Sequence, residues 1–167
     1  MRALTILLAL AALLAPMART FAAGLGPVKG SQLVTAYTAG ACPISGHTGT
    51  NSALVSQMVN ADGTTTAFTI PAKKIFVLTE LTATTGGQPA GDTMLINAEI
   101  GSAATGNIVA ARFTTVEPSG SVAAEFQIPT GIAIKAGSFL CVDMLDLTHG
   151  GFTGFTAIAH GYFAPDK

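Results

Sequence analysis

The amino-acid sequence predicts an all-β fold, specifically an antiparallel, jelly-roll-like β-sandwich of about eight to ten short strands. Apolar and polar residues alternate with a period of two in several stretches, and Gly, Pro, Asn and Asp punctuate the chain between them. No stretch beyond the N-terminal region keeps a 3.6-residue apolar period with helix caps. Alternation of this kind is typical of half-buried strands, and regularly spaced turns favour an antiparallel sandwich.

Three stretches show the alternation most clearly, at 94–100, 109–113 and 122–128. In the last of these, Val122, Ala124, Phe126 and Ile128 share one face, while the residues between them share the other. Successive side chains of a strand point to opposite faces, so the apolar set is expected in the core. Further expected strands are Leu33–Tyr37, Leu54–Val59, Thr65–Ile70, Lys74–Thr82, Ile132–Ile134, Ser138–Leu145 and Thr156–Phe163.

Turn-forming residues separate the expected strands. The sequence Asn-Ala-Asp-Gly at 60–63 carries the Asp-Gly pair of a tight hairpin. Gly and Pro recur at 84–92, 117–120, 135–137 and 148–154. These turns divide the chain into the short connections that an antiparallel fold requires.

The pattern Phe-x-Ile-Pro occurs twice, at 68–71 and 126–129, and a long apolar run follows each copy. Phe and Ile, two positions apart, are expected to face the core. Proline lacks the N–H that a central strand needs, so Pro71 and Pro129 are expected to end their strands. The repeated Phe-x-Ile-Pro pattern is therefore interpreted as a structural feature, a strand that ends at a proline before a core strand begins, and not as a functional motif.

Three segments together support a comparison with a known group of proteins. They are IPAKKIFVLTEL at 70–81, GIAIKAGSFLCVD at 131–143 and AHGYFAP at 159–165. They resemble segments of small bacterial secreted β-sandwich proteins, over about a third of the chain. Lys73 stands where those proteins usually carry Gly in the turn. The resemblance implies a jelly-roll-like fold and no defined activity, so it assigns no functional residue.

The N-terminal residues have the layout of a secretory signal peptide, predicted to span 1–22. Arg2 precedes an apolar run from Ala3 to Ala15, and small residues follow Pro16. The alternative, a membrane anchor, is disfavoured because the run is shorter than the roughly 20 residues of a spanning helix. Residues 23–52 are expected to form an arm or loop-rich segment, and 53–167 the β-sandwich domain. No later segment is apolar enough to span a bilayer.

Export makes an oxidising compartment the expected environment of the two cysteines, Cys42 and Cys141. A disulfide bond between them is therefore predicted. The alternative is two free thiols, with Cys141 buried in its strand. The expected localisation is secreted or periplasmic, with cell-surface association as an option.

The loop around 143–155 contains the candidate binding residues Asp146, His149, Phe152 and Phe155. A carboxylate and an imidazole at a strand end can bind a metal or act as acid and base. A tight metal site needs three or four ligands, however, so no metal or other cofactor is expected. The two Phe side chains can stack on a sugar or dock a partner, or they can fold back and close the end of the sandwich.

The composition narrows the function. The chain contains 8 Lys and Arg residues and 9 Asp and Glu residues. Removal of the signal peptide takes away Arg2 and Arg19, so the mature protein has a net charge of about −3. This negative charge argues against nucleic acid as a partner. No nucleophile elbow is present. A non-catalytic protein that binds or self-assembles, with itself or with another surface protein, is therefore predicted. The alternatives are a small-ligand or glycan-binding module, and a secreted hydrolase using Asp146 and His149.

Overall fold

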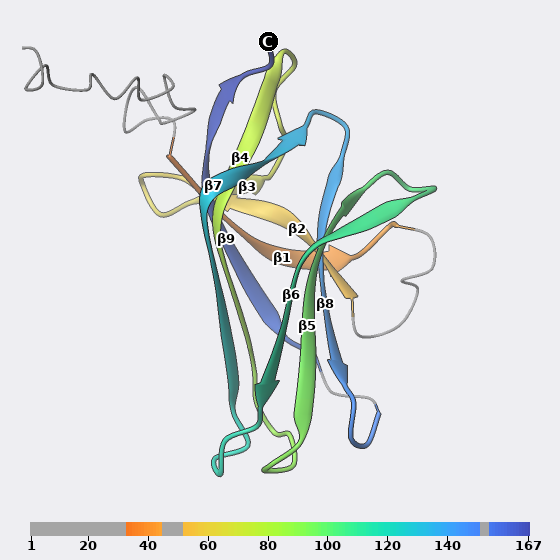
Figure 1. Cartoon of the computed structure of the whole chain (residues 1–167). Helices are drawn as coiled ribbons and strands as arrows, with labels where there is room; N and C mark the ends of the chain where they lie inside the picture. Colours follow the sequence, from red (N-terminus) through yellow and green to blue (C-terminus); the bar gives the residue numbers. More distant parts are fainter. Residues whose placement is uncertain (1–32, 45–51, 151–153) are drawn as a thin grey trace, which may run out of the picture.

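The computed structural model describes residues 33–44, 52–150 and 154–167, which form nine antiparallel strands (Figure 1). The predicted all-β, antiparallel class is therefore confirmed. The expected signal peptide lies outside the described residues. The strands are β1 Leu33–Ala41, β2 Ser52–Val59, β3 Thr65–Ala67, β4 Lys74–Thr85, β5 Thr93–Gly101, β6 Gly106–Thr115, β7 Val122–Lys135, β8 Phe139–Asp146 and β9 Thr156–Pro165.

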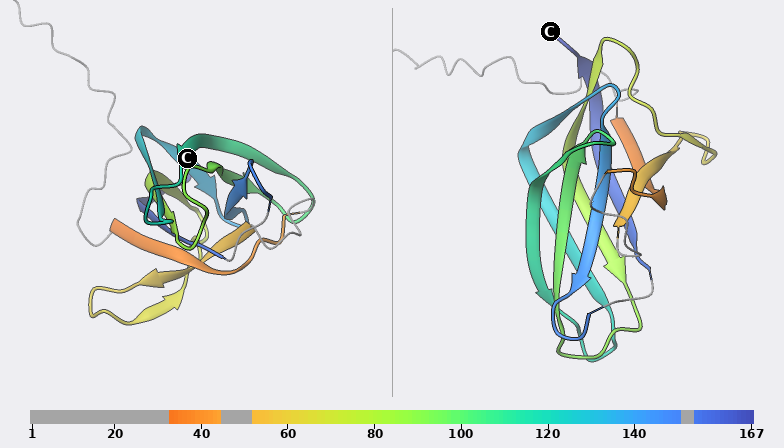
Figure 2. Two further views of the ribbon diagram at one scale, coloured as in Figure 1. Left: turned by 90° about the horizontal axis from the view of Figure 1, so that it is seen from below. Right: turned by 90° about the vertical axis from the view of Figure 1, so that its right-hand side faces the viewer.

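All nine strands belong to one sheet, in the order β6-β5-β8-β2-β1-β9-β4-β7, with β3 paired to β2 alone. The sheet curls until its two ends, β6 and β7, approach each other, so the eight strands make a nearly closed barrel. Viewed along its length, the strands ring a common interior and the β2–β3 hairpin extends away from them (Figure 2). The expected sandwich of two separate sheets is not what the structure shows.

The interior of the barrel is the main hydrophobic core. Met94, Ile96 and Ala98 of β5 are fully buried inside it, as the period-two pattern predicts. The inward face of β7 behaves in the same way, with Val122 and Ala124 at 2% exposure and Phe126 at 8%. The strands therefore form because alternate apolar side chains have one common interior to fill.

An aromatic cluster fills one part of this core. The ring of Phe76, a fully buried residue, lies 5.1 Å from the ring of Phe68 and 5.9 Å from that of Phe163, in edge-on geometries. Phe68 and Ile70, from the first Phe-x-Ile-Pro copy, are partly buried against the core, and so is Ile128 from the second. The prediction that these residues contribute to the core is confirmed.

The prediction that Pro129 ends its strand is wrong, because β7 runs on to Lys135. The pairing of β7 with β4 changes register here: Gln127 lies opposite Glu80, and the next pair is Ile132 with Leu78. The intervening residues form a bulge, where a proline removes no ladder hydrogen bond. The strand bends at this point (Figure 1). Pro71 lies outside any strand, in the connection between β3 and β4, but it does not end its strand as predicted, because β3 stops at Ala67 instead of Ile70.

The turn that leads into β4 contains an unusual backbone conformation. Lys73 has φ 61°, the only positive φ of a non-Gly residue in the described part of the chain. The backbone N–H of Lys74 closes the turn by donating to the carbonyl of Pro71 at 3.1 Å. Side chains with a Cβ atom are disfavoured in this left-handed region, so the turn is one that glycine would adopt more readily.

The predicted disulfide bond is confirmed: Cys42 and Cys141 are bonded across 99 positions of sequence. Cys141 alternates with the core residues Leu140 and Val142 and so faces the outside of the barrel. There it forms a second small cluster with Cys42 and the fully buried Ile44. The bond thus fixes the segment after β1 to the outer face of β8.

The region 23–52, expected to be an arm or loop-rich segment, contributes a complete strand in its described part. β1 lies between β2 and β9 in the sheet. Val34 and Ala36 of this strand are buried in the main core, at 6% and 0% exposure. The expected strand at Leu33–Tyr37 is therefore present and longer than predicted.

Candidate functional site

Two acidic residues and one histidine meet at the end of the barrel where β5 begins and β8 ends. Asp146 is the last residue of β8 and lies opposite Met94 of β5. Asp92 immediately precedes β5, and His149 lies in the loop after β8. Antiparallel pairing therefore places the end of β8 beside the start of β5 and brings the three side chains together.

Backbone hydrogen bonds fix this loop against β5. The Asp146 Oδ1 atom accepts hydrogen bonds from the backbone N–H of Thr148 at 2.7 Å and of His149 at 3.1 Å. The backbone N–H of Thr93 donates to Thr148 Oγ1 at 3.0 Å. Asp146 thus organises the turn in the way that Asp residues commonly do, by accepting hydrogen bonds from the chain just after them.

His149 then reaches back to Asp92, and its Nδ1 atom lies 2.8 Å from Asp92 Oδ2. The Asp92 side chain is 4% exposed, whereas that of His149 is 63% exposed. The hydrogen bond and the negative charge of Asp92 raise the pKa of His149 above its ordinary value. The pKa of Asp146 is lowered, chiefly by the backbone N–H of His149, although burial opposes this shift.

The structure thus brings Asp146 and His149 together and adds Asp92. Asp92 is 57 positions from His149. It lies in the segment 84–92, where the Gly and Pro residues predict a turn and nothing in the sequence indicates a site. Its role depends on strand register, for which the sequence carries no direct signal. Of the two predicted aromatic residues, Phe155 is partly buried and packs against the main core. Phe152 lies outside the described residues.

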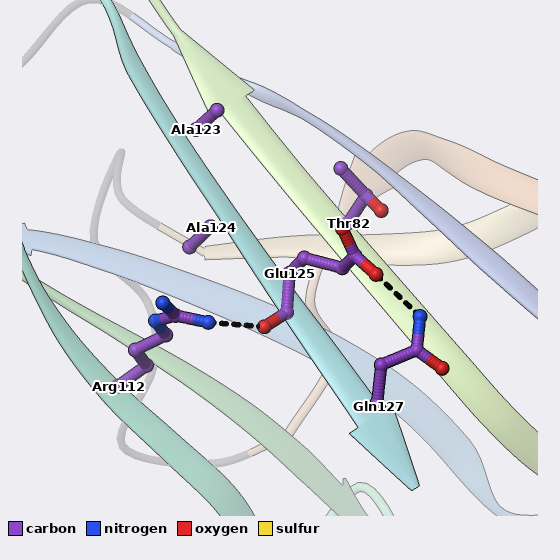
Figure 3. A pocket seen from close by; sticks show the side chains of 6 residues that line it. All are labelled: Thr82, Arg112, Ala123, Ala124, Glu125 and Gln127. Atoms are coloured by element: carbon purple, nitrogen blue, oxygen red, sulfur yellow. Dashed lines mark hydrogen bonds between the residues drawn. The ribbon is translucent and has the colours of Figure 1, made fainter.

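A second feature is the seam where the barrel stays open, between β6 and β7 (Figure 3). A pocket of about 510 Å³ lies here, lined by Thr82, Arg112, Ala123, Ala124, Glu125 and Gln127. Arg112 Nη1 donates a hydrogen bond of 2.6 Å to the backbone carbonyl of Glu125, and Gln127 Nε2 donates to the Glu125 carboxylate. The Arg112 side chain thus bridges the two sheet edges.

A third feature is a line of apolar side chains on the outer face of β8, β5 and β6. Leu95 lies opposite Leu145 on one side and opposite Phe113 on the other. Phe113 is 65% exposed and Leu145 36% exposed, and Leu147, two positions further along, is 52% exposed. We call these four residues the apolar row.

No protein-family model matches the chain, and no curated protein matches it either. Within the described residues, no helix is both long and apolar enough to cross a membrane.

Proposed function

We propose that this protein is an exported, non-catalytic β-protein that self-associates through the apolar row. The observation that carries the proposal is the register of Leu145, Leu95 and Phe113, which aligns three apolar side chains across neighbouring strands. Exposed apolar residues scattered singly are normal on protein surfaces, whereas a contiguous set marks an interaction site.

The charge distribution favours a second copy of the chain as the partner. The row itself contains no charged residue, and charged residues make up only 10% of the sequence. An uncharged surface provides no electrostatic attraction for a highly charged partner. Two copies of this chain, which has a small net charge, repel each other only weakly and can therefore associate. Two sheet faces can pack directly against each other with their apolar side chains interleaved. A two-fold axis through the row would bring the same residues of both copies into contact.

The disulfide bond supports the exported localisation, because such bonds form and persist in oxidising compartments. The strand order supports a jelly-roll connectivity. It divides into β1-β9-β4-β7 and β2-β8-β5-β6, and the chain crosses repeatedly between these two halves. Eight strands joined as two Greek keys define that architecture. We therefore propose that the barrel is a jelly roll whose two halves remain joined through β1 and β2.

The self-association is tested by sedimentation of the exported protein over a range of concentrations. We expect the wild type to form a dimer and Phe113→Glu to be monomeric, because the substitution replaces the most exposed side chain of the apolar row with a charge. Leu33→Glu is the matched control, since Leu33 is 62% exposed but belongs to β1. It should dimerise as the wild type does. A wild type that stays monomeric near 1 mM, or a Phe113→Glu variant that dimerises normally, would contradict the proposal.

A further inference from the structure

We propose that Asp92, Asp146 and His149 bind a divalent transition-metal ion of the zinc type. Each residue offers one ligand atom, and these atoms all lie within 4.8 Å of one another. Asp146 and His149 lie three positions apart, and the pairing of β5 with β8 brings Asp92, from a distant part of the chain, beside them. This site shares no residue with the apolar row, although Leu145 and Leu147 flank Asp146 in the chain, and its existence does not depend on self-association.

The burial of the two carboxylates calls for a positive charge beside them. Asp92 is 3% exposed and Asp146 is 7% exposed. Buried charges are stable in proteins only when they are paired or coordinate a metal. Among the residues that the structure describes, His149 is the cation that pairs with Asp92, and it carries at most one charge against two. A divalent ion would balance both carboxylates.

The donor atoms define the kind of ion. Two carboxylate oxygens and one imidazole nitrogen form a mixed donor set, and imidazole suits zinc and its neighbours better than magnesium or calcium. Calcium takes about six to eight oxygen ligands, which is many more than this cluster supplies. Zinc binds carboxylate oxygen and imidazole nitrogen at about 2.0–2.2 Å, so its ligand atoms lie within about 4 Å of one another.

The cluster can reach that geometry with small movements. Asp146 is held by the two backbone N–H groups that bind its Oδ1 atom. Asp92 is held by its burial, and the largely exposed His149 is the ligand that can shift inward. Three protein ligands leave a fourth, solvent-facing position of a tetrahedral ion for water. Metal binding would therefore fix the loop after β8 more firmly to the start of β5.

Isothermal titration calorimetry tests this inference. Tag-free protein is first stripped of metal with a chelator and is then titrated with zinc chloride. We expect one ion per chain with micromolar affinity. The variants Asp92→Asn and His149→Ala should each weaken binding at least tenfold. Asp62→Asn is the matched control: this aspartate also accepts hydrogen bonds within a turn, from Thr64, but has no place in the cluster. Its zinc affinity should equal that of the wild type.

A second measurement uses only the wild-type protein, so an effect of the substitutions on folding cannot influence it. In nuclear magnetic resonance spectra of the wild type, zinc should shift the imidazole signals of His149 and leave those of His160 unchanged. Absence of binding up to about 1 mM zinc would overturn the inference. Unchanged affinity in both Asp92→Asn and His149→Ala, or a shift confined to other histidines, would overturn it as well.

Discussion

The disulfide bond between Cys42 and Cys141 is expected to be a major contributor to stability. It closes a loop with a sequence separation of 99, and the chain-entropy model gives about 4.7 kcal/mol for a loop of that length. A domain of this size has a free energy of unfolding of only about 5–15 kcal/mol. Loss of the bond should therefore remove a large fraction of the stability and lower the Tm by roughly 10–20 °C.

Urea unfolding of the wild type and of a Cys42→Ala, Cys141→Ala double variant measures this contribution. The two proteins should differ by about 6–7 kcal/mol without reductant, because only the wild-type unfolded chain is cross-linked and the variant also loses packing at two buried side chains. With the disulfide reduced, the difference should fall to the packing loss at the two buried side chains, roughly 1–2 kcal/mol. A difference below about 1 kcal/mol under oxidising conditions would refute the reasoning.

Three further predictions concern single residues. Lys73→Gly should stabilise the protein by about 0.5–1 kcal/mol in urea unfolding, because glycine accepts the φ of 61° without steric cost; a loss of stability would contradict this. Gly161→Ala should destabilise by more than about 2 kcal/mol, because its Cβ would lie 2.1 Å from the carbonyl oxygen of Val77. Gly86→Ala, whose Cβ would meet nothing within 4 Å, is the control and should be nearly neutral. The pKa of Asp62 should lie below 3.8, because the Thr64 hydroxyl and backbone N–H donate to its carboxylate. The contribution of Asp62 to stability is fully present at pH values above the pKa that it has in the unfolded chain. This contribution is lost as the pH falls through the lower pKa that Asp62 has in the folded protein. A carbon-detected titration should show the Asp62 pKa rising toward 3.8 in Thr64→Val, and an unchanged value would exclude the hydroxyl as its cause.

Most strands could be predicted from sequence because alternation usually follows burial, but in β6 it does not, since Phe113 of the alternating stretch 109–113 is 65% exposed. Met94, Ile96 and Ala98 are buried for the reason that their spacing indicates. The closure of the sheet could not be predicted in the same way. Alternation shows which face of a strand is buried, but not whether the facing residues belong to a second sheet or to the same sheet after it has curled.

The candidate site shows the same limit. Asp146 and His149 are close in sequence, so a shared site at the strand end could be expected. Asp92 joins them only because Met94 lies opposite Asp146, and a shift of this register would move it away. The prediction that Pro129 ends its strand is wrong for a related reason. A bulge between β7 and β4 removes the requirement for its N–H, and the sequence does not show where the register changes.

The position of β9 has a consequence for how the protein folds. This strand is the last along the chain, yet it lies between β1 and β4 and pairs with both. The β1–β2 and β5–β6 hairpins can form from neighbouring segments as the chain is synthesised, but nothing can join β1 to β4 until β9 arrives. Assembly of the barrel is therefore completed only after synthesis reaches the final strand. Such dependence on distant contacts makes folding slow, and a chain truncated before Thr156 would be left with two uncovered strand edges in its centre.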